Sequence, residues 1–393
     1  MAKKNILFVT KTLNTGGVSI VSIFLANHFS KRGYNVSMFI LDPNSGSESH
    51  RVDNSVTIYH GVGVKYNITN KNLLKKVLKE RNIEIVINQW GLHWMTIKLI
   101  RKASSHQNIK VFTVYHNDPA ANGRLQLLNI KIGNTKSKLK KSFLLLQKFF
   151  VGYVTSLSMR YVYRNTDKYL LLSHSYIDNF KKFTKLRDIK KVGVQTNPIT
   201  IEKSFDESEL KNKEKTIIYV GRLNYIQKRV SRILYAWSKI EKDNPSWNLK
   251  IVGDGDEKDL LKLIIKEKGI KNVSLEGFKN PINYYKTASA IVLASEYEGF
   301  PLVLPEAMSF GVIPIVYASY PAIYDIIEDN IDGFIMPYNN SFNIDNFANL
   351  MQTFMRMPPT KLLKMQNDAL KKSKDYSIDV IVNQWEQKFN EVF

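Results

Sequence analysis

Short apolar runs, regularly separated by amphipathic stretches, are the feature that most constrains the fold of this chain. The runs cover residues 5–10, 35–41, 83–88, 109–115, 167–173 and 190–196, and then 216–221, 248–254, 272–277, 290–295, 312–317 and 333–337. Strands that are apolar along their whole length are typical of parallel sheets covered by helices on both faces. The pattern therefore predicts an α/β protein with two doubly wound, Rossmann-like domains.

The boundary between the two domains is predicted near Asn197-Pro198, where the first series of strands ends. The following residues, 200–215, are polar and charged, as expected of a linker. The C-terminal tail has a helical pattern with an apolar face formed by Ile378, Ile381, Trp385 and Phe389. The predicted divisions are residues 1–198 for the first domain, 199–376 for the second and 377–393 for a C-terminal helix.

The composition excludes several classes of protein. Of the 393 residues, 44% are hydrophobic and 23% are charged, close to the globular average, which excludes a mainly disordered chain. The absence of cysteine excludes disulfide frameworks, cysteine zinc sites, iron–sulfur clusters and thiol catalysis. The opening sequence, MAKKNILFVT, is interpreted as a first strand, because no small-residue cleavage site follows its short apolar run. A secretory signal peptide is therefore not expected.

Positive charge is concentrated in the first half of the chain. Residues 1–200 carry 32 basic and 9 acidic residues, whereas residues 201–393 carry 25 and 26. This asymmetry indicates a polyanionic partner, either a nucleic acid or an anionic membrane face. The best apolar stretch, 143–163, is interrupted by Gln147, Lys148 and Arg160 and is not expected to span a bilayer. We expect a cytoplasmic protein that is peripheral on the inner face of the cell membrane.

One basic segment, 131–164, combines lysines with apolar side chains. The lysines are Lys136, Lys138, Lys140, Lys141 and Lys148, and they surround Leu139, Phe143, Leu144, Leu145, Phe149 and Phe150. This pattern is found in amphipathic segments at membrane interfaces. The alternative is a domain helix whose apolar side belongs to the core and whose lysines are solvated. The excess charge of the first half favours the membrane.

Two motifs place anion-binding groups where a strand ends. Gly16-Gly17 lies between the first strand and a helix, where an open backbone and a helix N-terminus suit an anion. Arg222 and Lys228 lie in or beside the loop after the strand 216–221. Two fixed cations at the C-terminal end of a strand suit a diphosphate.

A third motif, in segment 295–316, carries two carboxylates. Glu298 lies in a loop that leaves a strand, and Glu306 lies in the first turn of a helix that Pro305 is expected to initiate. A carboxylate has two acceptor oxygens, which match neighbouring hydroxyls of a ribose or a hexose. The main chain between them offers N–H groups toward a phosphate or sugar, except at the proline, over Gly299, Phe300, Pro301, Leu302 and Val303.

Together these segments resemble glycosyltransferase family 4, a family of retaining enzymes with the GT-B fold. The string E-G-F-P-L-V-L-P-E-A-M-S-F-G at 298–311 resembles the E-x7-E signature of that family. The other matching elements, in the same order along the chain, are G-G at 16–17, N-P at 197–198, G-R-L and Q-K-R within 221–229, I-V-G-D-G-D-E at 251–257 and N-V-S-L-E-G-F at 272–278. The resemblance covers nearly the whole chain. It implies two domains that face each other across a cleft, with a C-terminal helix that crosses back to the first domain.

The resemblance implies that the second domain binds a nucleotide-sugar donor, for which UDP is favoured over GDP. Glu298 would bind hydroxyls of the donor sugar, and Glu306 would bind the ribose. Arg222 and Lys228 would bind the diphosphate and stabilise its charge as it leaves. The remaining donor contacts would come from the main chain of Gly16, Gly17, Phe278, Gly299, Phe300, Pro301, Leu302 and Val303.

Two further positions follow from the resemblance. His116, in V-Y-H-N-D after the fourth predicted strand, resembles a family position near the reacting carbon. Arg229 stands where many family members have glycine.

The first domain would bind the acceptor, plausibly a polyprenyl-diphosphate-linked saccharide used for a bacterial surface polysaccharide. The polar and aromatic residues Asn88, Trp90 and His93 are its predicted contacts. The implied reaction is a hexosyl transfer with retained configuration and an oxocarbenium-like transition state. The leaving phosphate would accept the proton of the acceptor hydroxyl on the same face.

No metal or cofactor is expected. Asp254-Gly255-Asp256 follows a strand, and turn and N-cap chemistry of the next helix explains it. Two alternative functions remain: a nucleotide-sugar epimerase of related fold, which would act without an acceptor, and a nucleic-acid-binding protein, suggested by net charge alone. No signature of an RNA-recognition motif, a helix-turn-helix or a zinc finger supports the second alternative.

Overall fold

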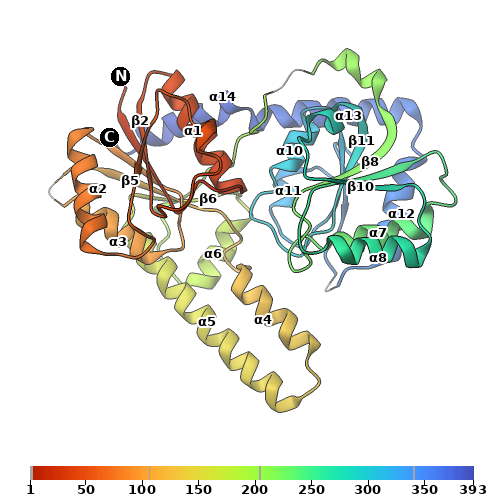
Figure 1. Ribbon diagram of the computed structural model, residues 1–393, viewed down its shortest axis with the longest axis horizontal. Coiled ribbons are helices and arrows are strands. Elements are labelled where there is room, and N and C mark those ends of the chain that lie inside the picture. Colours follow the sequence, from red (N-terminus) through yellow and green to blue (C-terminus); the bar gives the residue numbers. More distant parts are fainter. Residues whose placement is uncertain (1–2, 106, 203–204, 340) are drawn as a thin grey trace. The chain divides into compact units, whose positions relative to one another are not determined.

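The computed structural model describes residues 3–105, 107–202, 205–339 and 341–393, which form two compact units (Figure 1). The first unit extends to Thr200 and also includes Ile378–Phe393, and the second unit is Ile201–Ser377. The predicted divisions after residues 198 and 376 lie within two residues of these boundaries.

In the first unit, the described strands form one parallel sheet in the order β3-β2-β1-β4-β5-β6-β7. The strands are β1 Asn5–Thr10, β2 Asn35–Ile40, β3 Thr57–His60, β4 Ile85–Asn88, β5 Lys110–Tyr115, β6 Lys168–Leu171 and β7 Val192–Val194. The sequence prediction omitted β3. Its four residues lie at the sheet edge and are only partly buried, so they form no continuous apolar run.

The helices of the first unit connect these strands in the right order for a doubly wound domain. They are α1 Gly17–Lys31, α2 Ile68–Glu80, α3 Trp94–Ala103, α4 Gly123–Asn134, α5 Lys138–Arg164, α6 Tyr176–Thr184 and α14 Ile378–Asn390, with a 3₁₀ turn at Ser49–Arg51. The helix α14 is the C-terminal helix of the chain. Its Trp385 and Phe389 pack with Phe29 and Phe112, at ring-centroid distances of 5.2–6.1 Å. The apolar face that the sequence predicted for the tail therefore completes the core of the first unit.

In the second unit, the described strands form another parallel sheet in the order β10-β9-β8-β11-β12-β13. They are β8 Glu214–Val220, β9 Asn248–Val252, β10 Val273–Gly277, β11 Ala288–Leu293, β12 Ile313–Tyr317 and β13 Phe334–Met336. The helices are α7 Val230–Ile240, α8 Lys258–Lys268, α9 Ile282–Thr287, α10 Val303–Met308, α11 Ile323–Ile326, α12 Ile344–Met355 and α13 Pro359–Ser373, with 3₁₀ turns at Glu207–Asn212 and Lys374–Tyr376. The prediction of two doubly wound α/β domains is confirmed.

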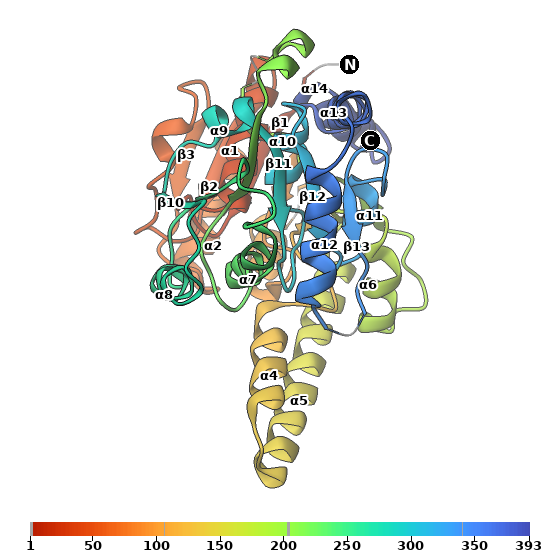
Figure 2. The same ribbon diagram turned by 90° about the vertical axis from the view of Figure 1, so that its right-hand side faces the viewer.

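The helices α4 and α5 form a hairpin between β5 and β6. Figures 1 and 2 both show them side by side, extending away from the sheet of the first unit. By length and composition, α5 would suffice to cross a membrane, which corrects the expectation that Gln147, Lys148 and Arg160 exclude such a segment. Length and composition do not distinguish a spanning helix from one that lies on a surface.

Candidate functional site

The predicted donor residues of the second unit gather at one edge of its sheet. From β8 the chain moves outward through β9 to β10, returns to the other side of β8 at β11, and moves outward again. The strand order therefore reverses between β8 and β11. In open α/β sheets, ligands bind beyond the carboxyl ends of the strands at such a reversal. Arg222 and Lys228 follow β8, and Glu298 and Glu306 follow β11.

Glycines hold the loop after β8 against the loop after β9. Gly253 and Gly255 both have φ near +150°, and a Cβ at either position would collide with a carbonyl oxygen, of Gly221 or Leu223 respectively. The main-chain N–H groups of Gly221 and Leu223 donate to the carbonyls of Val252 and Asp254. The G-x-G of the I-V-G-D-G-D-E element therefore serves backbone packing, and it fixes the start of the loop that carries Arg222.

A buried carboxylate fixes the other end of this loop. Glu257 is 1% exposed, and its two oxygens accept the N–H groups of Val230 and Ser231 at 3.0 and 2.9 Å. These are the first two residues of α7, so the carboxylate also meets the positive end of the helix dipole. Sequence reasoning did not single out Glu257. Glu257 is the final residue of the element I-V-G-D-G-D-E, and that membership was the only indication of its role in the sequence.

Arg229 takes the backbone conformation for which glycine is favoured. Its φ is +52°, in the left-handed region. Its guanidinium lies over the ring of Tyr225 at 4.5 Å and near the carboxylate of Glu296 at 3.9 Å. The departure from glycine at this position is thus accommodated by contacts of the arginine side chain.

An ion pair joins the two loops at the reversal point. Lys228 Nζ lies 2.6 Å from Oε1 of Glu298, and both side chains are largely buried. Gln227 Nε2 donates to the other carboxylate oxygen at 3.3 Å, and Arg222 donates to Gln227 Oε1 at 3.4 Å. The predicted sugar-binding carboxylate and the two predicted diphosphate-binding cations therefore belong to one connected cluster. Gln227 was not among the predicted site residues, although it lies within the quoted Q-K-R.

Glu306 lies in α10, which begins at Val303 with Leu302 as its N-cap. Pro305 is thus the third residue of the helix and does not initiate it, contrary to the prediction. The Glu306 carboxyl is 6% exposed, and its charge, together with burial, raises the pKa of Tyr285 well above the ordinary range. Burial is the larger cause of that shift.

The other predicted donor contacts of the second unit differ in how far their side chains are exposed to solvent. The Phe300 side chain is buried and packs on Tyr376 at 5.5 Å, so Phe300 can offer a ligand only its main chain. The predicted main-chain segment 299–303 runs directly into α10. Phe278, directly after β10, is 80% exposed at the same edge of the sheet.

The D-x-D at 254–256 does not supply the predicted N-cap. The N-cap residue of α8 is Glu257, and no side chain of the described residues caps that helix. Asp254 pairs with Lys258 at 2.7 Å, and this contact holds the pKa of Asp254 below its ordinary value. Asp256 accepts from Asn224 at 3.2 Å. Over the described parts of the chain, no three His, Cys, Asp or Glu side chains gather as metal ligands would.

In the first unit, the strand order reverses between β1 and β4. Gly16 and Gly17 follow β1, and Gly17 opens α1. Both glycines are exposed, and no described side chain caps the helix N-terminus or places an acid in its first turn. These features fit the predicted contact with an anion.

The end of β4 and the loop after it divide into a buried base and a partly exposed surface. Asn88 is fully buried, accepts the N–H of Trp90 and donates to Thr113, so it supports the start of the loop after β4. The rings of Trp90 and His93 stack at 3.9 Å. Burial, followed by the charges of Lys11 and Arg124, lowers the pKa of His93. This surface is therefore aromatic and positively charged.

His116 follows β5, beside this surface. Its Nε2 lies 2.7 Å from Oε1 of Gln89, and burial lowers its pKa to about 4. At neutral pH the imidazole is uncharged, Nε2–H donates to Gln89, and Nδ1 is left with the role of acceptor. Gln89 was missed by sequence reasoning; it adjoins Asn88 and Trp90, which were named.

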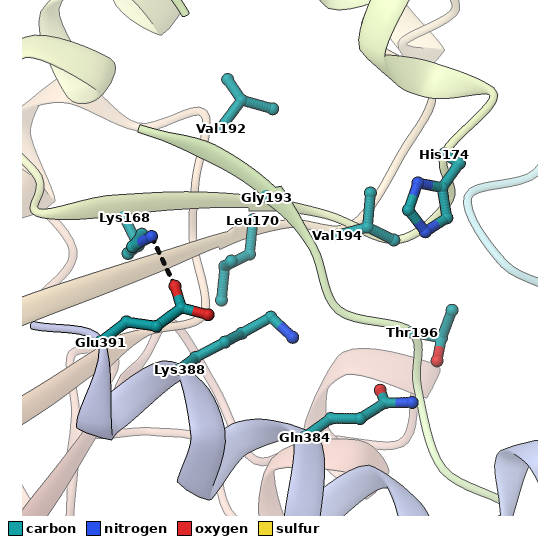
Figure 3. Close-up of a pocket in the computed structure, with 10 residues that line it drawn as sticks. All are labelled: Lys168, Leu170, His174, Val192, Gly193, Val194, Thr196, Gln384, Lys388 and Glu391. Atoms are coloured by element: carbon teal, nitrogen blue, oxygen red, sulfur yellow. Dashed lines mark hydrogen bonds and ion pairs between the residues drawn. The ribbon is translucent and has the colours of Figure 1, made fainter. Parts of the chain in front are cut away.

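A separate cavity of about 450 Å³ lies where α14 meets β6 and the edge strand β7 (Figure 3). Lys168 and Glu391 pair across its rim at 2.7 Å, and Gln384 accepts a hydrogen bond from Gln195. None of the predicted site residues lines this cavity. Its polar walls belong to the junction between the C-terminal helix and the sheet.

Known families match both units. Residues 15–203 match the family model described as Glycosyltransferase Family 4, and residues 200–374 match the one described as Glycosyl transferases group 1. The two matches together extend over most of the chain.

Relatives and solved structures are similar over the full length. An uncharacterized glycosyltransferase of Haemophilus influenzae is 27% identical over 98% of this chain and 99% of its own. A Campylobacter jejuni protein, named GalNAc-alpha-(1->4)-GalNAc-alpha-(1->3)-diNAcBac-PP-undecaprenol alpha-1,4-N-acetyl-D-galactosaminyltransferase, is 24% identical over 98% of each chain. The structure of HepE from Anabaena in complex with UDP and glucose has a TM-score of 0.71 and 16% identity, and it covers 98% of this chain and 99% of that one.

Proposed function

Since the chain is a glycosyltransferase with the GT-B fold that resembles family 4, we propose that it transfers a hexose from a UDP-sugar to a lipid-linked saccharide, with retention and without a metal. The observation that carries the proposal is the cluster of Lys228, Glu298 and Arg222 at the strand reversal of the second sheet. A carboxylate and two cations in one connected cluster match a sugar attached to a diphosphate.

Each charged group in this cluster has a proposed role. Arg222 and Lys228 bind the diphosphate, and Glu298 accepts hydrogen bonds from hydroxyls of the donor sugar. Glu306, in α10, accepts from the ribose. Because the loop after β8 is fixed at both ends, by Gly253 and Gly255 and by Glu257, the cations are held in place before the donor binds.

In the proposed reaction, the bond between C1 of the sugar and the diphosphate oxygen breaks, and a bond from C1 to the acceptor oxygen forms on the same face. The leaving diphosphate takes the bonding electron pair and accepts the proton of the acceptor hydroxyl. Arg222 and Lys228 stabilise the negative charge that grows on the diphosphate. Their fixed charges supply the function that a divalent cation serves in other transferases.

The acceptor is proposed to bind the first unit, where Trp90, His93 and Lys11 form an aromatic and cationic surface. A stacked aromatic pair suits a sugar ring, and the positive charge suits a diphosphate. The undecaprenol in the name of the Campylobacter jejuni relative supports a polyprenyl-diphosphate carrier, and with it a role in bacterial surface polysaccharide synthesis. His116 is proposed to contact the substrate as a neutral hydrogen-bond acceptor.

The test is to incubate the protein with single UDP-sugars and GDP-sugars, each with and without polyprenyl-diphosphate-linked saccharides. We expect UDP release that depends on the acceptor, and a product whose anomeric configuration, determined by NMR, is that of the donor. An inverted product would contradict the retaining reaction. Conversion of the UDP-sugar in the absence of acceptor would identify an epimerase instead.

A further inference from the structure

The α4–α5 hairpin carries an apolar surface that the first unit leaves uncovered. In the described chain, only 17% of the most apolar stretch of α5 is buried. Buried residues of α5 are concentrated toward its C-terminal end, at Ser156, Met159, Val162 and Tyr163. The part of α5 before these residues extends away from the sheet with α4 alone beside it (Figures 1 and 2).

The exposed apolar side chains of α5 form one continuous stripe. They recur in alternating steps of four and three residues, which places them on one face of a helix. The stripe consists of Leu139, Phe143, Leu146, Phe150, Tyr153 and Leu157. Leu139 is 87% exposed and Phe150 is 65% exposed. Phe149 adds a further exposed ring at its border.

The charge of the hairpin identifies what covers this stripe. Between Pro119 and Thr166 the sequence contains nine lysines and arginines and no aspartate or glutamate. A second copy of the same hairpin would bring like charges together along the stripe, at a cost that rises at low salt. An anionic bilayer offers negative head groups to the cations and an apolar boundary to the stripe.

We propose that the α4–α5 hairpin is the membrane-binding element of this protein and lies within the interface of an anionic bilayer. The apolar stripe enters the boundary between head groups and acyl chains, and Lys136, Lys138, Lys140 and Lys141 contact the head groups. A spanning orientation is disfavoured because Lys148 lies in the middle of α5, where burial of its charge in hydrocarbon is costly. The proposal does not depend on the reaction proposed above.

The base of the hairpin contacts the loop that carries two of the residues predicted to bind the acceptor. Ser158 of α5 donates to the carbonyl of Leu92 at 2.6 Å, in the loop that carries Trp90 and His93. The helix α4 begins at Gly123, shortly after His116. Insertion of the hairpin therefore keeps the carboxyl edge of the first sheet near the membrane surface, where a lipid-linked saccharide would be found.

The first experiment measures binding of the full chain to vesicles of phosphatidylcholine, with and without phosphatidylglycerol. Replacing Lys136, Lys138, Lys140 and Lys141 by Gln should lower the partition coefficient on anionic vesicles by roughly three orders of magnitude. The matched control replaces the exposed lysines of other helices, Lys75, Lys76, Lys79 and Lys102, by Gln and changes the net charge equally. The control should bind nearly as the unmodified protein does.

The second experiment measures insertion directly. Because the chain has no cysteine, Phe150→Cys or Leu263→Cys gives a single site for an environment-sensitive fluorophore. Leu263, in α8 of the second unit, is an exposed apolar residue and serves as the control. The fluorophore at position 150 should shift its emission to the blue on anionic vesicles, and the one at 263 should not.

Four results would overturn the proposal. The first is undiminished vesicle binding by the hairpin lysine variant, and the second is an equal loss in the control variant. The third is an unchanged emission at position 150 when the protein is vesicle-bound. If sedimentation shows that the hairpin holds two copies of the chain together and Phe150→Ser separates them, the partner is a second copy, and the proposal is likewise wrong. Circular dichroism and thermal melting establish that each variant is folded.

Discussion

The charged side chains proposed to bind the donor are held by other side chains before any ligand arrives. Glu298 accepts from Lys228 and Gln227, and Gln227 in turn accepts from Arg222. A carboxylate this deeply buried is destabilised when its cation is removed. Each substitution in the cluster therefore changes stability as well as ligand binding, and experiments on it need a variant that separates the two effects.

The first prediction concerns the diphosphate. Arg222→Ala and Lys228→Ala should each weaken UDP binding by about 1.5–3 kcal/mol, because a charged hydrogen bond is lost, and should leave uridine binding unchanged. Isothermal titration with UDP and with uridine measures the difference.

The double variant Lys228→Met with Glu298→Gln removes both charges of the buried pair, which restores stability but not UDP binding. Lys258→Ala, at the neighbouring loop, is the control and should bind UDP normally. Equal losses for UDP and uridine would contradict the assignment.

The second prediction concerns Glu257, which acts through the loop and does not touch the ligand. Glu257→Gln should lower the free energy of unfolding by about 1–3 kcal/mol and weaken UDP binding, because Arg222 and Lys228 lose their fixed loop. Glu241 is a matched control: it is also buried and accepts main-chain N–H groups, of Lys271 and Asn272, but at the opposite edge of the sheet. Glu241→Gln should cost stability and spare UDP binding. If urea unfolding and titration show the same pattern for both variants, Glu257 has no positioning role.

The third prediction concerns His116 and pH. Burial places its pKa, about 4 in the folded chain, below the ordinary value near 6.5. The unfolded chain therefore binds the proton more readily, so the contribution of His116 to stability is complete above pH 6.5 and is lost as the pH falls toward 4. His116→Gln should reduce the loss of unfolding free energy between pH 7 and 5, measured with urea. An identical pH dependence in the variant would show that His116 titrates normally.

At the scale of helices and strands, burial decides how much the sequence could predict. β5 was predictable because five of its six residues are buried, which gives a run that is apolar except at Thr113. β3 was not, because an edge strand of four half-exposed residues resembles a loop. The segment 131–164 was recognised as amphipathic and basic. Only the structure shows that its apolar stripe faces away from the core, since a pattern of residues does not state which face the domain covers.

The candidate functional site, like the helices and strands, was only partly predictable from the sequence. The resemblance to family 4 assigned Arg222, Lys228, Glu298 and Glu306, and strand order brings them to one edge of the sheet. The ion pair between Lys228 and Glu298 joins residues 70 positions apart, so it depends on β8 lying beside β11, which spacing alone does not reveal. The supporting contact of Glu257 with α7 was missed for the same reason. The burial of Asn88, a predicted acceptor contact, could not be foreseen because it depends on Thr113 of the next strand.

The fourth prediction belongs to the helix α14. Trp385 is 1% exposed and packs between Phe112 and Phe389. Trp385→Ala should destabilise the first unit by about 3–5 kcal/mol through the cavity it leaves. Hydrogen exchange should show faster exchange in β1, β4 and β5 while the second unit is unaffected. Equal acceleration in both units would indicate that they unfold as one.

At the scale of the whole molecule, the two units differ in charge. The first half of the chain has an excess of 23 positive charges and the second half an excess of one negative charge, by the residue counts given above. Nine of the cations lie in the stretch from 119 to 166, which contains the hairpin. Part of the charge asymmetry of the protein therefore lies in the α4–α5 hairpin. Solubility and vesicle binding should both respond to salt mainly through the first unit.

The fifth prediction concerns metal removal. If Arg222 and Lys228 stabilise the leaving diphosphate, turnover should be unchanged in EDTA and should not increase with Mn²⁺ or Mg²⁺. Asp254→Asn with Asp256→Asn should likewise keep full turnover, since these side chains contact Lys258 and Asn224. Loss of turnover in EDTA, restored by Mn²⁺ in the unmodified chain only, would assign the aspartates to a metal and contradict the proposed chemistry.

The division of the first unit between the two ends of the chain has a consequence for protein synthesis. On the ribosome, β1 to β7 emerge first, but the helix that covers Phe29 and Phe112 emerges only after the whole second unit. The second unit is continuous in sequence, so it can complete its core while the first still exposes apolar side chains. The unit that is made first is therefore the one that finishes folding last. A nascent chain stalled before Ile378 should expose the apolar side chains of an incomplete amino-terminal unit, and these stay available to a chaperone until α14 has emerged.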